Sequence, residues 1–306
     1  MSIIERDKNT ADDSLHKTPF TIRHTLINHP LFTLPKLVEL AKTMPRDKIE
    51  FSGGDVEIGQ SAETTPKLDM APQDVINRIE QHNAWMVIKR VEEVPEYHAL
   101  LKEFVDDLFT ASGKADQAYS HLEGYIFVSS ANATTPFHVD AEENILIQIK
   151  GDKTVHIFNN DDRSLVSEEA MEISPSKYRN QTYDTSFEDH AQVFKLQPGD
   201  GVHIPYLLPH WVKVEGEYSV SMAMTWKTPK VERLNKIRLM NGTMRHFGWP
   251  QKAPGISPVM DSLKVGLHDA MRMVLDPLRK SEKIRSLLRR VIYGKKANYY
   301  YNKAAE

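Results

Sequence analysis

Residues 192–226 read QVFKLQPGDGVHIPYLLPHWVKVEGEYSVSMAMTW, and this stretch decides the expected fold class. It contains four short strand candidates that are separated by turn-forming Pro, Gly and Asp: 192–196, 201–205, 210–214 and 218–226. Three more precede it in the chain: 125–130, 144–150 and 153–158. Many short strands at close spacing, without helices between them, are typical of a β-sandwich or a barrel.

The regions on either side of these strands show patterns that are typical of helices. Residues 71–83 and 95–109 show apolar side chains at helical spacing, each with a Pro near the start, and residues 85–91 form a buried strand pattern. Residues 19–70 read as irregular, with a short helix at 35–43. Beyond Pro229 the chain turns helical again, and an apolar stripe is broken near Pro277: Met260, Leu263, Leu267, Met271, Val274 and Leu278. A second stripe, 284–292, lies within the basic segment 279–296.

These strand and helix patterns predict three regions in the chain. Residues 1–18 are polar and are expected to be disordered, residues 19–230 form a catalytic domain with an N-terminal α/β elaboration, and residues 231–306 form a C-terminal helical region. Within the second region, residues 159–190 are a long polar insertion, and insertions of that length usually carry function or lack order. We expect this insertion and the N-terminal segment to shape access of the substrate.

Composition excludes several kinds of site. The chain has no cysteine, which rules out disulfides, thiolate zinc sites and cysteine nucleophiles, so any metal must bind His, Asp or Glu. The formal net charge is −3, which gives no overall electrostatic argument for nucleic acid or a membrane surface. No stretch approaches 18 continuous apolar residues, and the N-terminus lacks an apolar signal region. The expected location is the cytoplasm.

The central motif is His138-Val139-Asp140. Residues i and i+2 of a strand point to the same face, so both side chains can enter one barrel interior. A second histidine from a distant strand would complete a set of two imidazoles and one carboxylate, which leaves three coordination positions open, as non-haem Fe(II) oxygenases require. Pairs of this kind also arise by chance at strand ends, so the surrounding sequence has to decide.

The surrounding sequence resembles the two signatures of the cupin superfamily. Gly199, Pro205 and His210 have the spacing of the second signature, although Leu207 stands where glycine is usual. In the first signature, Asp140 takes the place of the second histidine and Asn144 that of a ligand glutamate, with Gly151 seven residues later. The carboxylate at position 140 favours the oxygenase branch of cupins over the isomerase and storage branches. The resemblance implies a mainly β fold, a double-stranded β-helix or jelly-roll barrel with flanking N-terminal and C-terminal helices.

Within that superfamily the chain resembles the Jumonji-C-like hydroxylases, and in particular the asparaginyl hydroxylases of the factor-inhibiting-HIF type. The match consists of residues 135–140, 143–144, 148–153, 198–200, 204–205, His210 and Trp226. This resemblance implies that His138, Asp140 and His210 are the catalytic residues that hold Fe(II). It also implies that Thr135 and Lys153 hold the distal carboxylate of 2-oxoglutarate, and that Asn144 lies near this co-substrate.

Physical chemistry agrees with the implied site. A dianionic co-substrate inside a narrow barrel needs a charge partner to offset its desolvation. Lys153 follows the Gly151-Asp152 turn on a strand and could point inward, where a hydroxyl from Thr135 would add a hydrogen bond. Without the resemblance, Lys153 would read as a solvent-facing strand lysine and Thr135 as a turn residue before Pro136.

Other residues fit structural roles, in the core or on the surface, better than a role in the site. His203 competes as a metal ligand, but its place seven residues before His210 favours packing on its strand; His156 reads as a core or surface residue. Trp211 and Trp226 are interpreted as packing residues of the barrel. For Tyr125 and for Trp85, both a place in the pocket lining and a place in the core remain open. The basic C-terminal helix reads as a solvated face rather than a nucleic-acid or lipid site.

The sequence therefore predicts an Fe(II)- and 2-oxoglutarate-dependent dioxygenase that hydroxylates a protein side chain or a small molecule and releases succinate and CO2. The alternatives are a metal-binding cupin, enzyme or sensor, that does not use 2-oxoglutarate, and a Jumonji-type lysine demethylase, which would share the same triad. The expected partners are a protein or small-molecule substrate and a second copy of the chain, which the related hydroxylases bind through C-terminal helices. Nucleic acid is not expected, and fold and triad do not identify the substrate.

Overall fold

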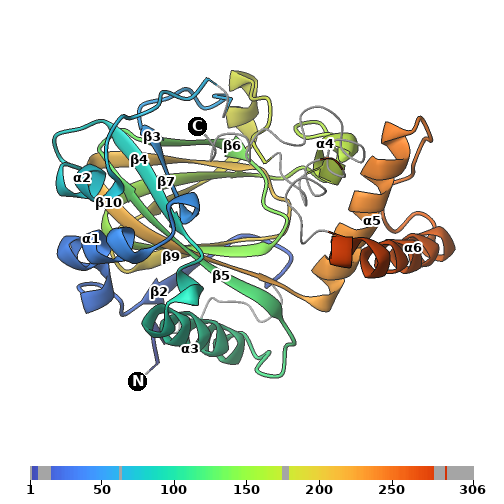
Figure 1. The fold of residues 1–306 in the computed structure, drawn as a ribbon, viewed down its shortest axis with the longest axis horizontal. Helices are drawn as coiled ribbons and strands as arrows, with labels where there is room; N and C mark the ends of the chain where they lie inside the picture. The colour runs from blue at the N-terminus through green and yellow to red at the C-terminus, as the bar shows by residue number, and fades with distance from the viewer. Residues whose placement is uncertain (1, 6–14, 62–63, 174–178, 279–286, 288–306) are drawn as a thin grey trace. The chain divides into compact units, whose positions relative to one another are not determined.

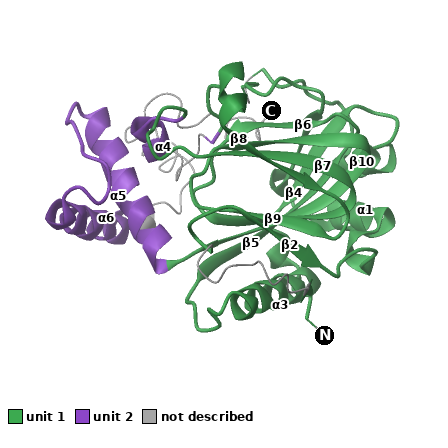
Figure 2. Ribbon diagram, turned by 180° about the vertical axis from the view of Figure 1, so that it is seen from behind, with its two compact units in different colours: residues 1–165, 180–228 green, residues 166–179, 229–306 purple. Residues whose placement is uncertain are grey.

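The structure is a computed structural model that describes residues 2–5, 15–61, 64–173, 179–278 and 287 (Figure 1). The chain divides into two compact units, which Figure 2 colours separately. Unit 1 comprises residues 1–165 and 180–228, and unit 2 comprises residues 166–179 and 229–306. All strands of the described residues belong to unit 1.

Unit 1 is mainly β. Its sheet has ten strands: β1 Ile4–Glu5, β2 Phe20–His24, β3 Ile49–Gly53, β4 Ala84–Lys89, β5 Ser120–Ser129, β6 Thr134–His138, β7 Glu143–Phe158, β8 Ala191–Leu196, β9 Asp200–Ile204 and β10 His210–Lys227. Three α-helices accompany them: α1 Leu34–Thr43, α2 Pro72–Asn77 and α3 Pro95–Ala111. The 3₁₀ turns are η1 Pro30–Phe32, η2 Arg46–Lys48, η3 Val91–Glu93 and η4 Thr185–His190. Each α-helix has Pro at its first or second position, where a missing N–H costs nothing.

Two long strands organise the sheet. The first part of β7 pairs with β9 and with the second part of β10, which in turn pairs with β5. The second part of β7 pairs with β8 and with the first part of β10, which also pairs with β6. All these pairs are antiparallel. Strands β7 and β10 therefore contribute to both layers of a jelly roll, as the sequence predicted (Figure 1).

The two faces of the strands have separate cores. Side chains of β4, β5, β7 and β10 on the outer face pack with α1, α2 and α3, for example Ile126, Ile145 and Met222 against Leu37, Val75 and Phe104. The inner face forms a smaller cluster from both layers: Leu146, Val155, Ile157, Leu196, Val202, Ile204, Val212 and Ala223. Because this cluster joins the two parts of β7, the inner faces of the layers meet there.

The alternation of β7 changes phase at Gly151. Before it, even-numbered residues such as Leu146 face inward; after it, odd-numbered residues such as Val155 and Ile157 do. Gly151 has φ of +71°, and a Cβ there would lie 2.4 Å from the carbonyl oxygen of Tyr218. The pairing of β7 with β10 shifts register at the same place, so this glycine is the irregularity that lets one strand serve both layers.

The sequence interpretation located most elements but split the long strands. Segments 144–150 and 153–158 are one strand, β7, and segments 210–214 and 218–226 are one strand, β10. Strands β2 and β3 lie in the region that was expected to be irregular. The insertion at 159–190 contains α4, Glu168–Ile173, and η4.

Unit 2 contains α4, α5 Pro229–His246 and α6 Pro258–Leu278. Ion pairs join α5 to α4: Arg238 to Glu168 at 2.9 Å and Arg245 to Glu172 at 2.7 Å. Helix α6 continues through Pro277, where the sequence suggested a break. Apart from residue 287, the basic segment 279–296 lies outside the described residues.

Among the described helices, none has the length and apolar character that a membrane span would need.

The role of Gly151 can be tested against a matched glycine. We expect Gly151→Ala to lower the free energy of unfolding by about 3 kcal/mol, because a left-handed backbone costs about 1–2 kcal/mol and the contact with Tyr218 adds to it. Gly216→Ala is the control, since Gly216 has φ of +64° but no atom within 4 Å of its Cβ position. That variant should lose only about 1 kcal/mol in urea unfolding. Equal losses would show that the contact at Gly151 does not matter.

Candidate metal centre

His138, Asp140 and His210 come together although the first and the last are 72 positions apart in the sequence. His138 ends β6, His210 begins β10, and the two are direct partners in the antiparallel pairing. Their rings lie 4.1 Å apart between centroids. Asp140 follows β6, and its Oδ2 lies 3.7 Å from Nε2 of His210. One potential ligand atom from each side chain falls within 4.8 Å of the others.

Backbone contacts fix how the two imidazoles present their nitrogens. Nδ1 of His138 lies 2.7 Å from the carbonyl oxygen of Pro136, and Nδ1 of His210 lies 2.9 Å from that of Leu208. A carbonyl oxygen can only accept, so Nδ1 carries the hydrogen in both rings. The Nε2 lone pairs are then available to a metal. The hydrogen bond from Nδ1 to the backbone holds each ring in the orientation that presents Nε2.

The carboxylate is oriented by Asn144. Nδ2 of Asn144 donates to Oδ2 of Asp140 over 2.8 Å, and both residues are buried. The sequence predicted that Asn144 lies near a co-substrate. The structure adds a direct contact between Asn144 and Asp140, the carboxylate of the candidate metal centre. Oδ1 of Asn144 is buried without a hydrogen-bond partner among the described residues, so it can still accept from a bound molecule.

Leu207 adopts the left-handed backbone conformation that a glycine would adopt easily at this motif position. Its φ of +59° is left-handed, which costs a residue with a Cβ about 1–2 kcal/mol. Its N–H donates to the carbonyl oxygen of Asp140 over 2.9 Å, and its side chain is 5% exposed. The loop between β9 and β10 therefore keeps the conformation that the motif glycine would allow, and it ties the backbone of the carboxylate residue to that loop.

Lys153 points to the inner face and is 4% exposed. Its Nζ donates to Oγ of Ser221 over 2.6 Å and lies 5.5 Å from the centre of the Phe127 ring. Among the described residues, no carboxylate forms an ion pair with it. Desolvation lowers the pKa of Lys153 to about 7. The structure thus holds a buried amine whose charge lacks an anionic partner, which is costly unless a ligand supplies one.

Thr135 reaches the same inner face through a register shift. In a regular strand, positions 135 and 138 would face opposite ways. The pairing of β6 with β10 shifts by one residue between His210 and Val212, so Thr135 lies opposite Val212, a member of the inner cluster. Oγ1 of Thr135 accepts from Nε1 of Trp85 over 2.9 Å. The Thr135 hydroxyl therefore keeps its own hydrogen for another acceptor.

The structure adds two residues to this region. Trp85, for which the sequence left a pocket role and a core role open, contacts Phe127 at 5.9 Å between ring centroids and so lies between Thr135 and the ring beside Lys153. Ser221 had a sequence signal that the interpretation did not use. Positions 219, 221, 223 and 225 are the small residues Ser, Ser, Ala and Thr, which alternate with larger apolar residues, and Ala223 belongs to the inner cluster. His203 is not part of this centre: its Nε2 contacts Glu143 at 3.2 Å on the outer face. His156 stacks on Trp211 at 3.9 Å and contacts Glu188.

The buried amine makes a prediction about pH. The pKa of an unfolded lysine is near 10.4, whereas that of Lys153 in the fold is about 7. Between these values the unfolded chain binds more protons, so the free energy of unfolding must rise with pH. We expect the metal-free chain to gain stability relative to Lys153→Met from pH 7 to pH 10 in urea unfolding. Below pH 7 the difference should stay constant, and parallel curves over the whole range would contradict the burial of the amine.

Several solved structures are similar to the chain. No curated protein sequence matches the chain. A solved structure of E. coli YcfD aligns with a TM-score of 0.49 at 15% identity, covering 95% of this chain and 73% of that one. Another, described as a ribosomal oxygenase from Escherichia coli in complex with cobalt and 2-oxoglutarate, gives 0.49 and 15%, with coverage of 92% and 69%. Oxalate decarboxylase from Bacillus subtilis gives 0.25 and 16%, with 35% and 22%.

A family model extends over most of unit 1. The model described as the cupin-like domain matches residues 19–231, about two thirds of the 306 residues, and this range includes His138, Asp140, His210, Thr135 and Lys153. This agrees with the jelly-roll topology and with the paired histidines at the strand ends. The chain belongs to the cupin-like domain family.

Proposed function

We propose that the chain is an Fe(II)- and 2-oxoglutarate-dependent dioxygenase that hydroxylates a protein side chain or a small molecule and releases succinate and CO2. One observation carries the proposal. The buried Lys153 lacks a carboxylate partner among the described residues, and it shares the inner face of the fold with a set of two histidines and one aspartate.

The ligand set fits Fe(II). Two imidazoles and one carboxylate on one side of the ion leave adjacent positions open, which is the pattern of non-haem Fe(II) oxygenases. Here His138 and His210 have their Nδ1 atoms committed to backbone carbonyls, and Asp140 is oriented by Asn144. The preset orientation of all three side chains argues for a metal centre rather than a chance cluster.

The remaining polar groups fit 2-oxoglutarate. This co-substrate carries two carboxylates, and one of them could pair with Lys153 while accepting from Thr135. A carboxylate beside the amine would raise the pKa of Lys153 from about 7 and keep it protonated at neutral pH. Ser221 and the Trp85–Thr135 contact hold the two donors in place.

The protein's part in the reaction is to bind, orient and exclude water. Dioxygen would be the oxidant. Bound Fe(II) and 2-oxoglutarate would activate it, so that one oxygen atom enters succinate, the other enters the substrate as hydroxyl, and CO2 is released. His138, Asp140 and His210 would hold the metal, and Lys153 and Thr135 would fix the co-substrate. The apolar side chains of the inner cluster, among them Val155, Ile157 and Val212, keep water from this face.

Two alternatives share parts of the site. A metal-binding cupin that does not use 2-oxoglutarate would need the triad but not a buried lysine, and Lys153 argues against it. A lysine demethylase would use every group described, so it differs only in substrate. We retain the resemblance to asparaginyl hydroxylases as a hypothesis about the substrate class, in which a protein side chain is the first candidate.

Succinate formation tests the proposal directly. The purified chain with Fe(II), ascorbate and 2-oxoglutarate should produce succinate slowly even without its substrate, and His138→Ala should abolish it. Lys153→Ala should weaken 2-oxoglutarate binding by about 10- to 100-fold, because it removes a charge-assisted bond worth about 1.5–3 kcal/mol.

The matched control is Lys150→Ala. Lys150 lies on the same strand, but its side chain is exposed and pairs with Glu217 on the surface, so its loss should leave succinate formation unchanged. The proposal fails if the wild-type chain makes no succinate and 2-oxoglutarate does not raise the melting temperature of the iron-loaded chain.

Trp85→Phe probes the threonine side of the site. It removes the donor to Thr135 but keeps an aromatic ring against Phe127. We expect a rise of about 2- to 10-fold in the KM for 2-oxoglutarate, the effect of one neutral hydrogen bond, with little change in kcat. Trp211→Phe is the control, because Nε1 of Trp211 donates to Glu188 instead. If both variants behave alike, the Thr135 contact has no special role.

Self-association through unit 2 is a further part of the proposal. Helix α6 exposes a set of apolar side chains: Val259, Met260, Leu263, Leu267, Met273 and Val274. Sets of this kind mark association surfaces, and we propose a second copy of the chain as the partner. Light scattering of the full chain at several concentrations tests this, and a monomer throughout would contradict it.

A further inference from the structure

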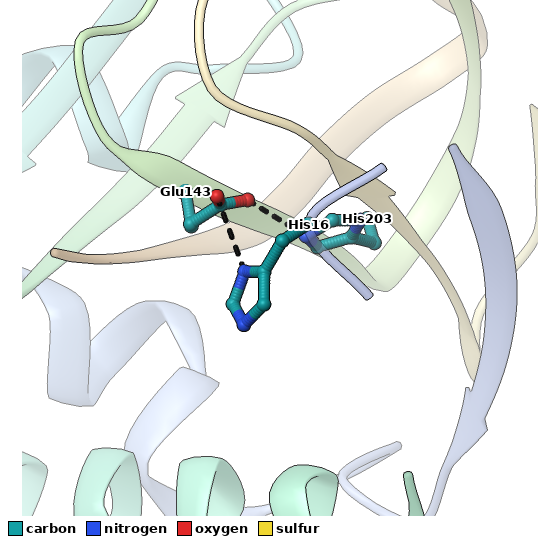
Figure 3. A group of neighbouring side chains, drawn as sticks. All are labelled: His16, Glu143 and His203. Carbon is teal, nitrogen blue, oxygen red and sulfur yellow. Dashed lines mark hydrogen bonds and ion pairs between the residues drawn. The ribbon is translucent and has the colours of Figure 1, made fainter. Parts of the chain in front are cut away.

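A second cluster of metal-ligand types lies on the outer face of the same strands. It consists of His16 from the N-terminal segment, Glu143 at the start of β7 and His203 on β9 (Figure 3). Glu143 precedes Asn144, the residue that contacts Asp140, and neighbouring strand residues face opposite ways. The two clusters are therefore on opposite faces of the strands and share no residue.

The three side chains converge on the carboxylate. Nδ1 of His16 lies 3.1 Å from Oε1 of Glu143, and Nε2 of His203 lies 3.2 Å from Oε2 (Figure 3). The side chains of Glu143 and His203 are 2% and 0% exposed, and that of His16 is 17% exposed. Each carboxylate oxygen thus meets one imidazole nitrogen, and His16 is the most exposed of the three side chains.

Among the described residues, imidazoles alone compensate the charge of Glu143. Burial by itself would raise the pKa of Glu143, but the contacts with His16 and His203, through hydrogen bonding and charge, outweigh it, and the pKa falls to about 2. Glu143 is therefore an anion at any physiological pH. Among the described residues, no lysine or arginine forms an ion pair with it. A buried carboxylate of this kind needs a cation or further donors.

Aromatic rings enclose the cluster. Phe20 stacks on His203 with 4.8 Å between centroids, Trp226 lies 6.1 Å from His203, and Phe109 lies 6.5 Å from His16. Polar ligands inside an apolar shell are the usual setting of a bound metal, because the shell keeps water and competing groups away. Nδ1 of His203 has no hydrogen-bond partner among the described residues, so the one polar contact of this ring there is with Glu143.

We propose that His16, Glu143 and His203 form a second site for a divalent metal of the zinc type. Two imidazoles and one carboxylate suit Zn²⁺, which bonds nitrogen at about 2.0–2.1 Å and carboxylate oxygen at about 2.0–2.2 Å. In a tetrahedral site these bonds place neighbouring ligand atoms about 3.3 Å apart. Here one potential ligand atom of each side chain lies within 4.8 Å of the other two, so side-chain movements of about an ångström would bring them to that spacing. A water molecule would fill the fourth position on the side of His16.

Such a metal would pin the N-terminal segment to the barrel. Leu15 is 1% exposed, and His16 has a left-handed φ of +71°, so the chain is already turned inward at this point. Strands β7 and β9 supply the other two ligands. The expected role is structural and independent of the metal at His138, Asp140 and His210.

The test is metal stoichiometry with Zn²⁺ as the probe. After dialysis, the wild-type chain should bind two equivalents and the double variant His138→Ala/His210→Ala should bind one. Adding Glu143→Gln or His16→Asn to that double variant should remove the remaining equivalent. His16→Asn suits the left-handed backbone, because Asn tolerates this conformation better than most residues. Far-ultraviolet circular dichroism checks that each variant is folded.

Stability gives the second readout. Zn²⁺ should raise the melting temperature of the double variant, and Glu143→Gln or His16→Asn should abolish the rise. His156→Gln is the matched control, since His156 also contacts a carboxylate, Glu188 at 2.8 Å, but lacks a second histidine. It should leave both the stoichiometry and the rise unchanged. The proposal is overturned if the double variant binds no Zn²⁺, or if its Zn²⁺ persists without His16 and Glu143.

Discussion

The site depends on a constraint in β7, which must present residues to the inner face of both layers. A regular strand alternates strictly, so a strand that turns Asn144 and Leu146 inward would turn Lys153 outward. The irregularity at Gly151 resets the alternation, and only a residue without a Cβ fits beside the carbonyl oxygen of Tyr218. The burial of the Lys153 amine follows from this one position. A similar reset in β6 brings Thr135 to the face of His138.

The electrostatics of the inner face follow from this arrangement. The cluster of His138, Asp140 and His210 contains one carboxyl group, and the buried amine of Lys153 has no anionic partner among the described residues. Desolvation keeps the pKa of Lys153 low while the site is empty of anions, and a bound carboxylate would reverse that shift. Burial of this amine without an anionic partner lowers the stability of the fold, although its Nζ donates to Ser221. Costs of this kind are typical of binding sites rather than of structural cores.

Sequence reasoning could reach the triad because its spacing obeys simple rules. Positions 138 and 140 share a face in any strand, and the spacing from Gly199 to His210 describes a turn, a strand and a loop. It could not show that Gly151 lies inside one continuous strand, because glycine reads equally well as a turn. Nor could it place Trp85 against Thr135 or bring His16 to Glu143, since contacts between distant segments leave no periodic pattern. At Leu207 the sequence pattern departs from the motif but the structure does not. The loop keeps its left-handed turn although the motif glycine is absent.

The central claim is that one pocket binds both a metal and 2-oxoglutarate, with Lys153 as the anion partner. Calorimetric titration of 2-oxoglutarate into the chain, without metal and with Fe(II) under exclusion of oxygen, tests it most directly. The account predicts that Fe(II) strengthens binding by at least about tenfold, or about 1.4 kcal/mol, and that Asp140→Ala removes this gain. Equal affinity with and without metal, or no binding in either case, would contradict it.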